Sequence, residues 1–169
     1  MKILIISDSH GLQEELGVIK EAHRDDIDLM IHCGDSELPF NHESLKGFVV
    51  VKGNCDFDNN FPNEVEQEVN GYKLLATHGH LFHVKNSLMT LSYRADEIGA
   101  QIVCFGHSHI AGSERIADKL FINPGSISMP RGRKDPTYCI LEVYKKELHV
   151  VFYNKDHTEL KDLSQKYSM

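Results

Sequence analysis

The sequence has no excess of positive charge, no paired cysteine motif and no long apolar run. Lys and Arg number 18 against 25 Asp and Glu, which gives a formal net charge of −7. A protein that binds nucleic acids or membrane surfaces through a basic face would show the opposite balance. We therefore expect neither general nucleic-acid binding nor a membrane partner. A phosphate-bearing substrate remains possible, because a bound metal ion can supply positive charge locally.

The cysteines and the first residues both indicate a reducing environment. The four cysteines form no Cys-x-x-Cys pair, and Cys33, Cys104 and Cys139 lie in or beside apolar runs, where a free thiol packs as a small hydrophobe. The opening MKILIISDSHG is too short in apolar residues for a signal peptide, since Asp8 follows at once. No run approaches membrane-spanning length. These features predict a cytoplasmic protein without a disulfide framework.

Length and composition predict one globular unit. The chain has 169 residues, of which 41% are hydrophobic and 25% charged, as in ordinary soluble domains with a sizeable core. No internal repeat, low-complexity tract or linker divides the sequence. We expect a single domain over residues 1–169, with a homodimer through an apolar sheet edge as a possibility.

Short apolar runs predict a series of strands. The early runs are continuously apolar, as in strands covered on both faces, whereas the late ones alternate more. The segment 144–147 between the last two runs indicates a hairpin turn, and the polar stretch after Asn154 is expected to be loosely held. The predicted strands are Ile3–Ile6, Leu29–His32, Phe48–Val51, Tyr72–Ala76, Ile102–Phe105, Leu120–Ile122, Tyr138–Val143 and Leu148–Phe152.

Two stretches have the apolar periodicity of amphipathic helices. The first runs from Leu12 to about His23, and the second from Ser87 to about Gly99. Asn86 or Ser87 is the expected N-cap of the second helix, and Gly99 its stop. Together with the strands, these helices predict a mixed α/β fold.

Five of the predicted strands are followed by loops that hold Asp, Asn or His, usually beside glycine. In an open α/β sheet, ligands bind outside the carboxyl ends of the strands, so these loops are expected to converge. The other six histidines show no such placement and are read as structural. The loops are Asp8-Ser9-His10, Gly34-Asp35, Gly53-Asn54-Cys55-Asp56, His78-Gly79-His80 and Gly106-His107-Ser108-His109.

Each loop taken alone also fits an ordinary turn. Asp8 fits a cap of the following helix, and a single histidine is more often solvated or hydrogen-bonded than bound to a metal. The joint pattern favours a metal site, because chance turns would not choose only Asp, Asn and His at five successive strand ends.

The chemistry of these side chains suits divalent metals. Imidazole, carboxylate and amide oxygen are ligands for ions such as Mn, Fe, Ni or Zn. Seven side chains exceed what one such ion accepts, so they fit two ions that share a ligand, and a carboxylate is the natural bridge. Two ions about 3.5–4 Å apart can ionise a water and stabilise the attacking and leaving oxygens of a displacement. The residual positive charge would attract a phosphate.

Taken in order, the five motifs resemble those of the calcineurin-like metallophosphoesterases. Its small size and its Gly53-Asn54-Cys55-Asp56 sequence make the chain most similar to the small YfcE-like phosphodiesterase branch, and the segment 123–126 (Asn-Pro-Gly-Ser) also resembles that branch. The match covers most of the chain. It implies a four-layer αββα sandwich of two mixed β-sheets flanked by helices, with the metal site at the C-terminal ends of the strands.

The resemblance also implies a metal-dependent phosphodiesterase. A hydroxide bridging two divalent ions would attack the phosphorus of a small phosphodiester in line, with no covalent intermediate. Manganese is the expected metal, with Ni, Zn, Fe and Mg as alternatives. The implied ligands are Asp8, His10 and His109 for one ion, Asn54, His78 and His107 for the other, and Asp35 as the bridge.

One position departs from the wider superfamily. Many members have histidine after the asparagine, where it is thought to help the leaving group, but here the residue is Cys55. A thiol is a doubtful replacement acid, so we expect hydrolysis of activated diesters and slower hydrolysis of poor leaving groups. Asp56, also a catalytic candidate, is expected to orient a neighbour. His80 and Arg131 are the candidate substrate-binding residues, although Arg131 also fits a solvated basic loop.

Two other classes of function fit parts of the sequence. Gly34-Asp35-Ser36 resembles the Gly-Asp-Ser motif of a serine esterase family, with Asn54 as an oxyanion donor. That family needs Asp-x-x-His near the C-terminus, where this chain has Asp156-His157 instead. The retromer complex contains a scaffold subunit of the metallophosphoesterase fold with a degraded metal site. Here all seven implied ligands are present, which favours catalysis over a scaffold that binds protein partners.

Overall fold

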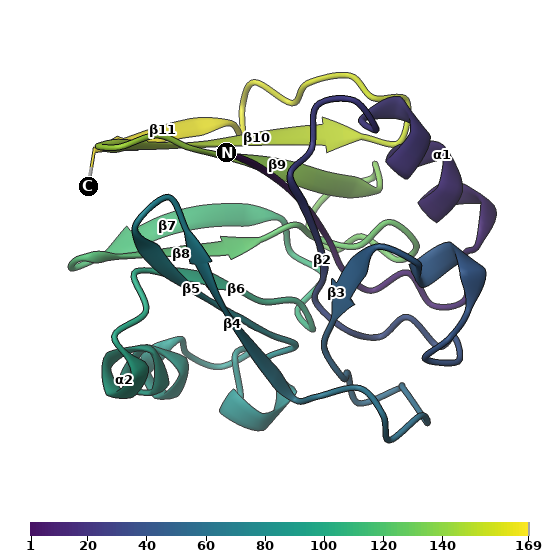
Figure 1. Cartoon of the computed structure of the whole chain (residues 1–169), viewed down its shortest axis with the longest axis horizontal. Helices are drawn as coiled ribbons and strands as arrows, with labels where there is room; N and C mark the ends of the chain where they lie inside the picture. The colour runs from purple at the N-terminus through teal and green to yellow at the C-terminus, as the bar shows by residue number, and fades with distance from the viewer. Residues whose placement is uncertain (169) are drawn as a thin grey trace.

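The computed structural model describes residues 1–168, which form two mixed β-sheets packed face to face (Figure 1). The first sheet has the strand order β11-β10-β9-β1-β2-β3, with β1, β2 and β3 parallel and β9 antiparallel to β1. Its strands are β1 (Lys2–Ile6), β2 (Leu29–His32), β3 (Phe48–Val50), β9 (Thr137–Val143), β10 (Glu147–Asn154) and β11 (Gln165–Ser168).

The second sheet has the order β4-β5-β6-β8-β7 and places β5, β6 and β8 parallel at its centre. Antiparallel strands close both of its edges. Its strands are β4 (Glu64–Val69), β5 (Tyr72–Thr77), β6 (Ile102–Cys104), β7 (Gly112–Ile116) and β8 (Lys119–Asn123).

Apolar side chains fill the space between the sheets and the two outer layers. Residues of both sheets, such as Ile5, Leu74 and Leu141, form the central core with no exposed surface. Burial of such a side chain contributes about 1.5–3 kcal/mol, so this layer is the main source of stability. On the outer faces, α1 (Glu14–Ala22) covers the first sheet and α2 (Met89–Ile98) covers the second (Figure 1). This is the predicted αββα sandwich.

The helices end close to their predicted limits, but their N-terminal caps differ. No side chain caps α1, whose N-cap position is Gln13, and the carboxylate of Asp8 instead accepts a hydrogen bond from His107 N. Leu88 takes the N-cap position of α2, and the hydroxyl of Ser87 accepts a hydrogen bond from Met89 N. Gly99 ends α2 with a φ of 71°, the left-handed conformation that glycine adopts without strain. The Asp8 cap is therefore wrong, and the Gly99 stop is confirmed.

The eight predicted strands are confirmed to within two residues, including the hairpin between β9 and β10. Three further strands were not predicted: β4, β7 and β11. All three lie at sheet edges and expose polar side chains, so they lack the apolar runs on which the prediction depended. The polar tail is not loosely held, because β11 pairs with β10 and Tyr167 packs against the central core.

Two short 3-10 helices complete the described structure, η1 (Glu43–Leu45) and η2 (His80–Phe82). Within residues 1–168, no helix has the length and apolar character needed to cross a membrane. The five loops singled out in the sequence follow β1, β2, β3, β5 and β6. They meet at one edge of the sandwich, where their side chains form the site described next.

Candidate metal centre

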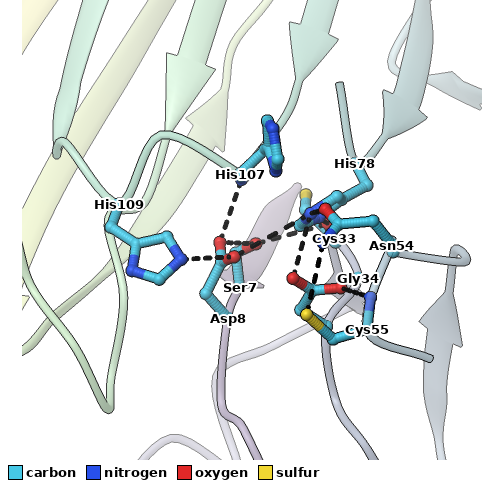
Figure 2. Close-up of polar contacts among 12 residues, drawn as sticks. Ser7, Asp8, Cys33, Gly34, Asn54, Cys55, His78, His107 and His109 are labelled. Atoms are coloured by element: carbon cyan, nitrogen blue, oxygen red, sulfur yellow. Dashed lines mark hydrogen bonds and ion pairs between the residues drawn. The ribbon is translucent and has the colours of Figure 1, made fainter. Parts of the chain in front are cut away.

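Two groups of donor side chains meet at the carboxyl ends of the strands (Figure 2). The first donor group consists of Asp8, His10 and His109, and the second consists of Asp35, His78 and His107. Within each group, one donor atom from every side chain lies within 4.8 Å of the others, which is close enough for one metal ion. His10 and Asp35 form a further group with Cys55, so the two donor groups are contiguous.

The carboxylate of Asp8 has one oxygen bound by the protein and one left free. Oδ2 accepts hydrogen bonds from Ser7 Oγ at 2.6 Å and from the backbone N–H of His107 at 3.1 Å. Oδ1 is buried and has no hydrogen-bond partner, although His109 Nε2 lies 3.0 Å away. A buried carboxylate oxygen without a donor is costly unless a cation approaches it, so this atom fits a metal ligand.

Three of the four imidazoles are fixed through the ring nitrogen that faces away from the donor groups. His10 Nδ1 lies 2.5 Å from Glu37 Oε1. His78 Nδ1 donates to the carbonyl of Cys33, and His109 Nδ1 donates to the carbonyl of Met129, both at 2.7 Å. In each ring Nε2 is then the atom free to bind a metal, as is usual for histidine ligands.

The carboxylate of Asp35 lies between the two groups. Its Oδ1 accepts from the backbone N–H of Cys55 at 2.7 Å, and its Oδ2 lies 3.3 Å from His78 Nε2. Only 2% of Asp35 is exposed. Asn54 places its amide oxygen 3.2 Å from the same His78 nitrogen and donates its amide N–H to Cys55 Sγ at 3.2 Å. The amide oxygen of Asn54 therefore faces the second donor group.

Asp56 lies behind the site and joins two of its loops. Its Oδ2 accepts from the backbone N–H groups of Asp35 and Gly53, both at 2.8 Å. Its Oδ1 accepts from Ser36 Oγ and from Glu37 N. With both oxygens engaged by the loops, Asp56 acts as a positioning residue.

The serine esterase alternative fails on the same contacts. Ser36 is fully buried, and its hydroxyl donates to a carboxylate at 3.0 Å. No imidazole of residues 1–168 contacts this hydroxyl. His157, the histidine of the C-terminal Asp-His pair, contacts the hydroxyl of Tyr138 instead.

The backbone of the ligand loops is strained where the side chains turn inward. Positive φ angles between 44° and 65° occur at Asp8, His10, Asp35, His107 and His109. Such conformations cost about 1 kcal/mol or more for a residue other than glycine and persist at functional sites. Close packing adds to the constraint, because a Cβ at Gly53 would lie 2.0 Å from Asp35 Oδ1. The fold therefore holds these side chains in place at a cost in stability.

Charges in the site keep both carboxylates ionised. Burial disfavours the ionised form, but His109 and His78 outweigh it and hold the pKa of Asp8 below its usual range. His78 has the same effect on Asp35, whose pKa lies far below the usual range. Asp8 raises the pKa of His109, whereas burial is the main cause that lowers the pKa of His107 to about 4. The carboxylates thus offer negative charge that cations would neutralise.

The two predicted substrate-binding residues lie beside the donor groups. The ring of His80 is 5.3 Å from that of His78 and 6.1 Å from that of His107, and its buried Nδ1 has no partner. Arg131 is exposed, and its backbone N–H donates to the carbonyl of His109 at 2.9 Å. Neither residue belongs to a donor group.

The basic loop that contains Arg131 is only partly available for a substrate. Arg133 of the same loop pairs with Asp162 at 2.8 Å and is therefore tied to the C-terminal region.

The sequence did not single out several residues that hold the site together. Glu37 fixes His10, Ser7 fixes Asp8, and the buried His32 links two ligand loops through Ser9 Oγ and Gly34 N. Ser7 and Glu37 lie one and two residues from predicted ligands, and this proximity was the available signal. The sequence gave no such signal for His32, because this residue continues an apolar strand.

Comparison with known proteins identifies the family of the chain. The calcineurin-like phosphoesterase superfamily domain matches residues 1–146. The chain is 50% identical to the probable metallophosphoesterase YsnB of Bacillus subtilis over 169 residues, which is 100% of both chains. It superimposes with a TM-score of 0.95 on a predicted phosphoesterase from Streptococcus pneumoniae, at 35% identity and over 99% of this chain and 97% of the other.

A third relative is the phosphodiesterase YfcE of Escherichia coli. It is 29% identical over 108 residues, which is 56% of this chain and 52% of YfcE. The structure superimposes on the solved structure of YfcE over 99% of both chains, with a TM-score of 0.71. With donor groups that suit metal ions, these matches confirm the predicted resemblance. The chain belongs to the calcineurin-like phosphoesterase superfamily and is a metal-dependent phosphoester hydrolase.

Proposed function

We propose that this protein is a phosphodiesterase that uses two divalent metal ions. The observation that carries the proposal is the pair of contiguous donor groups, with the buried and unpartnered Asp8 Oδ1 in one of them and Asp35 between them. One ion would be held by Asp8, His10 and His109, the other by Asn54, His78 and His107, and Asp35 would bind both.

Two bound ions would act as Lewis acids on the phosphoryl oxygens and lower the pKa of a water between them. The protein's own residues supply the arrangement. Glu37 and two backbone carbonyls fix three imidazoles, and Asp56 holds the loop of Asp35 against that of Asn54. The donor set combines imidazole, carboxylate and amide oxygen, which suits manganese and also Ni, Zn, Fe or Mg.

His80 and Cys55 lie beside the donor groups. His80, whose ring lies beside those of His78 and His107, is a candidate for binding the substrate phosphate, together with Arg131. Burial and the neighbouring Asp35 raise the pKa of Cys55 to about 11, so the thiol stays protonated at neutral pH. A neutral thiol is a weak proton donor, and its contact with Asn54 Nδ2 indicates a role in orienting that amide.

A diester rather than a monoester substrate is supported by the name of one relative, the phosphodiesterase YfcE. The weak acidity of Cys55 agrees with this choice for activated substrates, because an aryl oxide needs little protonation to leave. Diesters with alkoxide leaving groups should therefore react more slowly.

The proposal is tested by hydrolysis of bis-p-nitrophenyl phosphate. Chelator-stripped protein should be inactive and should regain activity when Mn, Ni, Zn or Mg is added. Asp35→Asn should abolish this activity, whereas Asp25→Asn is a matched control because the side chain of Asp25 is 97% exposed. Metal-independent activity, or an active Asp35→Asn protein, would overturn the proposal. No hydrolysis with any metal, in a protein that binds two ions, would favour the scaffold function instead.

A further inference from the structure

A pocket of about 520 Å³ opens beside the metal centre, on the outer side of the second sheet. It lies between the segment that leads into α2 and the edge strand β7. None of the proposed metal ligands lines it. The lining residues include Val84, Lys85, Leu88, Phe105, Ile110 and Arg131.

The pocket shares a wall with the metal centre. Ser108 lines the pocket and stands between His107 and His109, one from each donor group. Asn123 makes this wall rigid, because its amide donates to Ser108 Oγ at 2.9 Å and to a backbone carbonyl of the same loop at 3.0 Å. A molecule bound at the metal centre would therefore have this pocket directly beside it.

The inner surface of the pocket is mainly apolar. Phe105 and Phe121 are nearly buried there, at 7% and 1% exposure. Val84 and Leu88 come from the side of α2, and the exposed Ile110 stands at the ligand loop. Surfaces of this kind bind flat organic groups by excluding water.

Two cations line the same pocket. Within residues 1–168, neither Lys85 nor Arg131 has a carboxylate within ion-pair distance, whereas the neighbouring Arg133 is paired. Glu114, on β7, is the acidic residue of the lining. In a chain with a net charge of −7, two unpaired cations at one pocket indicate an anionic ligand.

One of the cations is also tied to the metal centre. The backbone N–H of Arg131 donates to the carbonyl of His109 at 2.9 Å. Arg131 thus lies at the boundary between the pocket and the first donor group.

We propose that this pocket binds the organic ester group of the substrate and that Lys85 and Arg131 bind a second phosphate carried by that group. This proposal rests on the proposed phosphodiesterase function. A flat ring system with a second phosphate is the chemistry of a nucleotide, so the substrate class would be nucleotide diesters. The apolar walls would bind the base, and the cations would bind the phosphate that is not cleaved.

The test uses three p-nitrophenyl esters that release the same leaving group. Methyl p-nitrophenyl phosphate has neither base nor second phosphate, thymidine 5′-(p-nitrophenyl phosphate) has the base, and its 3′-phosphorylated form has both. The pocket predicts that KM falls from the first to the second and again to the third. Each step should be about fivefold, as expected for roughly 1 kcal/mol of added binding.

Variants separate the two halves of the pocket. Lys85→Ala should raise KM for the 3′-phosphorylated ester about fivefold and leave KM for the methyl ester unchanged. Arg131→Ala should raise KM for the 3′-phosphorylated ester by a larger factor than KM for the methyl ester. Ile110→Ser should raise KM for both thymidine esters. The substitution should not impair folding, because Ile110 is 56% exposed. Lys134→Ala is the matched control, since Lys134 is an exposed residue of the same loop that does not line the pocket.

The outcomes distinguish this proposal from the function on which it rests. Metal-dependent cleavage of the methyl ester, with equal KM values for all three substrates, would leave the phosphodiesterase intact and overturn the nucleotide pocket. The same holds if Lys85→Ala and Arg131→Ala do not change the preference for the second phosphate. No cleavage of any ester with any metal would overturn the phosphodiesterase itself. Independently of activity, thymidine 3′,5′-bisphosphate should bind more tightly than thymidine 5′-phosphate in calorimetry, and equal affinities would contradict the pocket.

Discussion

The two donor groups of the metal centre differ in how firmly the protein holds them. In the first group every side chain has a second contact. Ser7 and a backbone N–H bind one oxygen of Asp8. Glu37 fixes the ring of His10, and a backbone carbonyl fixes that of His109.

The second group has fewer such contacts. A backbone carbonyl fixes His78, and the backbone N–H of Cys55 binds Asp35. Asn54 is exposed, and its amide is oriented by the sulfur of Cys55. Within the described chain, the ring of His107 makes no hydrogen bond. Contacts of this kind change metal affinity by about 10–100-fold, so the two groups should bind their ions with different affinities. We expect the first group to bind its ion tightly and the second group to bind a weaker, exchangeable ion.

Asp8→Asn should break the firmer group and have the largest effect. An asparagine must turn its NH₂ either toward the N–H and O–H groups that now donate to Oδ2 or toward the metal, and both orientations are unfavourable. We expect activity to fall by roughly 10³-fold, about 4 kcal/mol, without recovery at high Mn concentration. Steady-state rates over a Mn titration check this, and recovery by excess Mn would show that the first group is not the tight one.

Acid should lower the free energy of unfolding through His32. This buried ring links the loops of Asp8 and Asp35, and burial lowers its pKa to about 4. Below pH 6.5 the unfolded chain takes up a proton that the folded protein does not, so the free energy of unfolding falls until pH 4 is reached. The full contribution of this group is about 3 kcal/mol.

Urea unfolding of chelator-stripped protein between pH 7 and 4 measures this effect. His32→Gln should be less stable at pH 7 and should have a shallower pH dependence than the parent protein. His149→Gln serves as a control on a partly exposed histidine far along the chain. If the free energy of unfolding of His32→Gln depends on pH as steeply as that of the parent protein, His32 is not the cause of the acid sensitivity.

Asn54→Ala should affect only the second ion. Asn54 is exposed and lies at the edge of its group. Its loss should lower the affinity for the second ion by about 100-fold, at the upper end of the range for a lost contact. Activity at low Mn should fall, and excess Mn should restore most of it. Rates measured over the same Mn titration as for Asp8→Asn sharpen the comparison, and a loss that Mn does not restore would contradict it.

Glu37→Gln should have the smallest effect of the four changes. A glutamine can still accept from His10 Nδ1 but no longer adds negative charge. We expect about tenfold weaker binding of the first ion and no change in the second. Equilibrium dialysis at two Mn concentrations separates the two ions, and a change confined to the second ion would reverse the assignment.

The contrast between these residues also explains what the sequence could predict. Asp8, Asp35 and His109 were predicted because each lies in a short loop directly after an apolar strand, where a local pattern is enough. Their spatial grouping followed from the parallel strand ends. His32 was read as structural, and its link between two loops depends on packing across two strands.

Other features left no local pattern. The edge strand β4 has only Val65 and Val69 as apolar residues, and the tail strand β11 is mostly polar, so both depend on their partner strands. The pocket beside the metal centre draws on segments from Val84 to Arg131, and Lys85 is a candidate binding residue only because distant segments of the chain complete the pocket around it. The carbonyl contacts of His78 and His109 are likewise fixed by the fold and not by residue type.

Calorimetric titration of chelator-stripped protein with Mn measures the number and the affinities of the bound ions. We expect two ions per chain with unequal affinities. Asp8→Asn should abolish binding of the tight ion, and Asn54→Ala should abolish detectable binding of the weak ion. Asp35→Asn should lower the affinity for both ions. A single ion per chain, or two ions whose binding is unchanged in Asp35→Asn, would contradict a centre built from two donor groups that share this carboxylate.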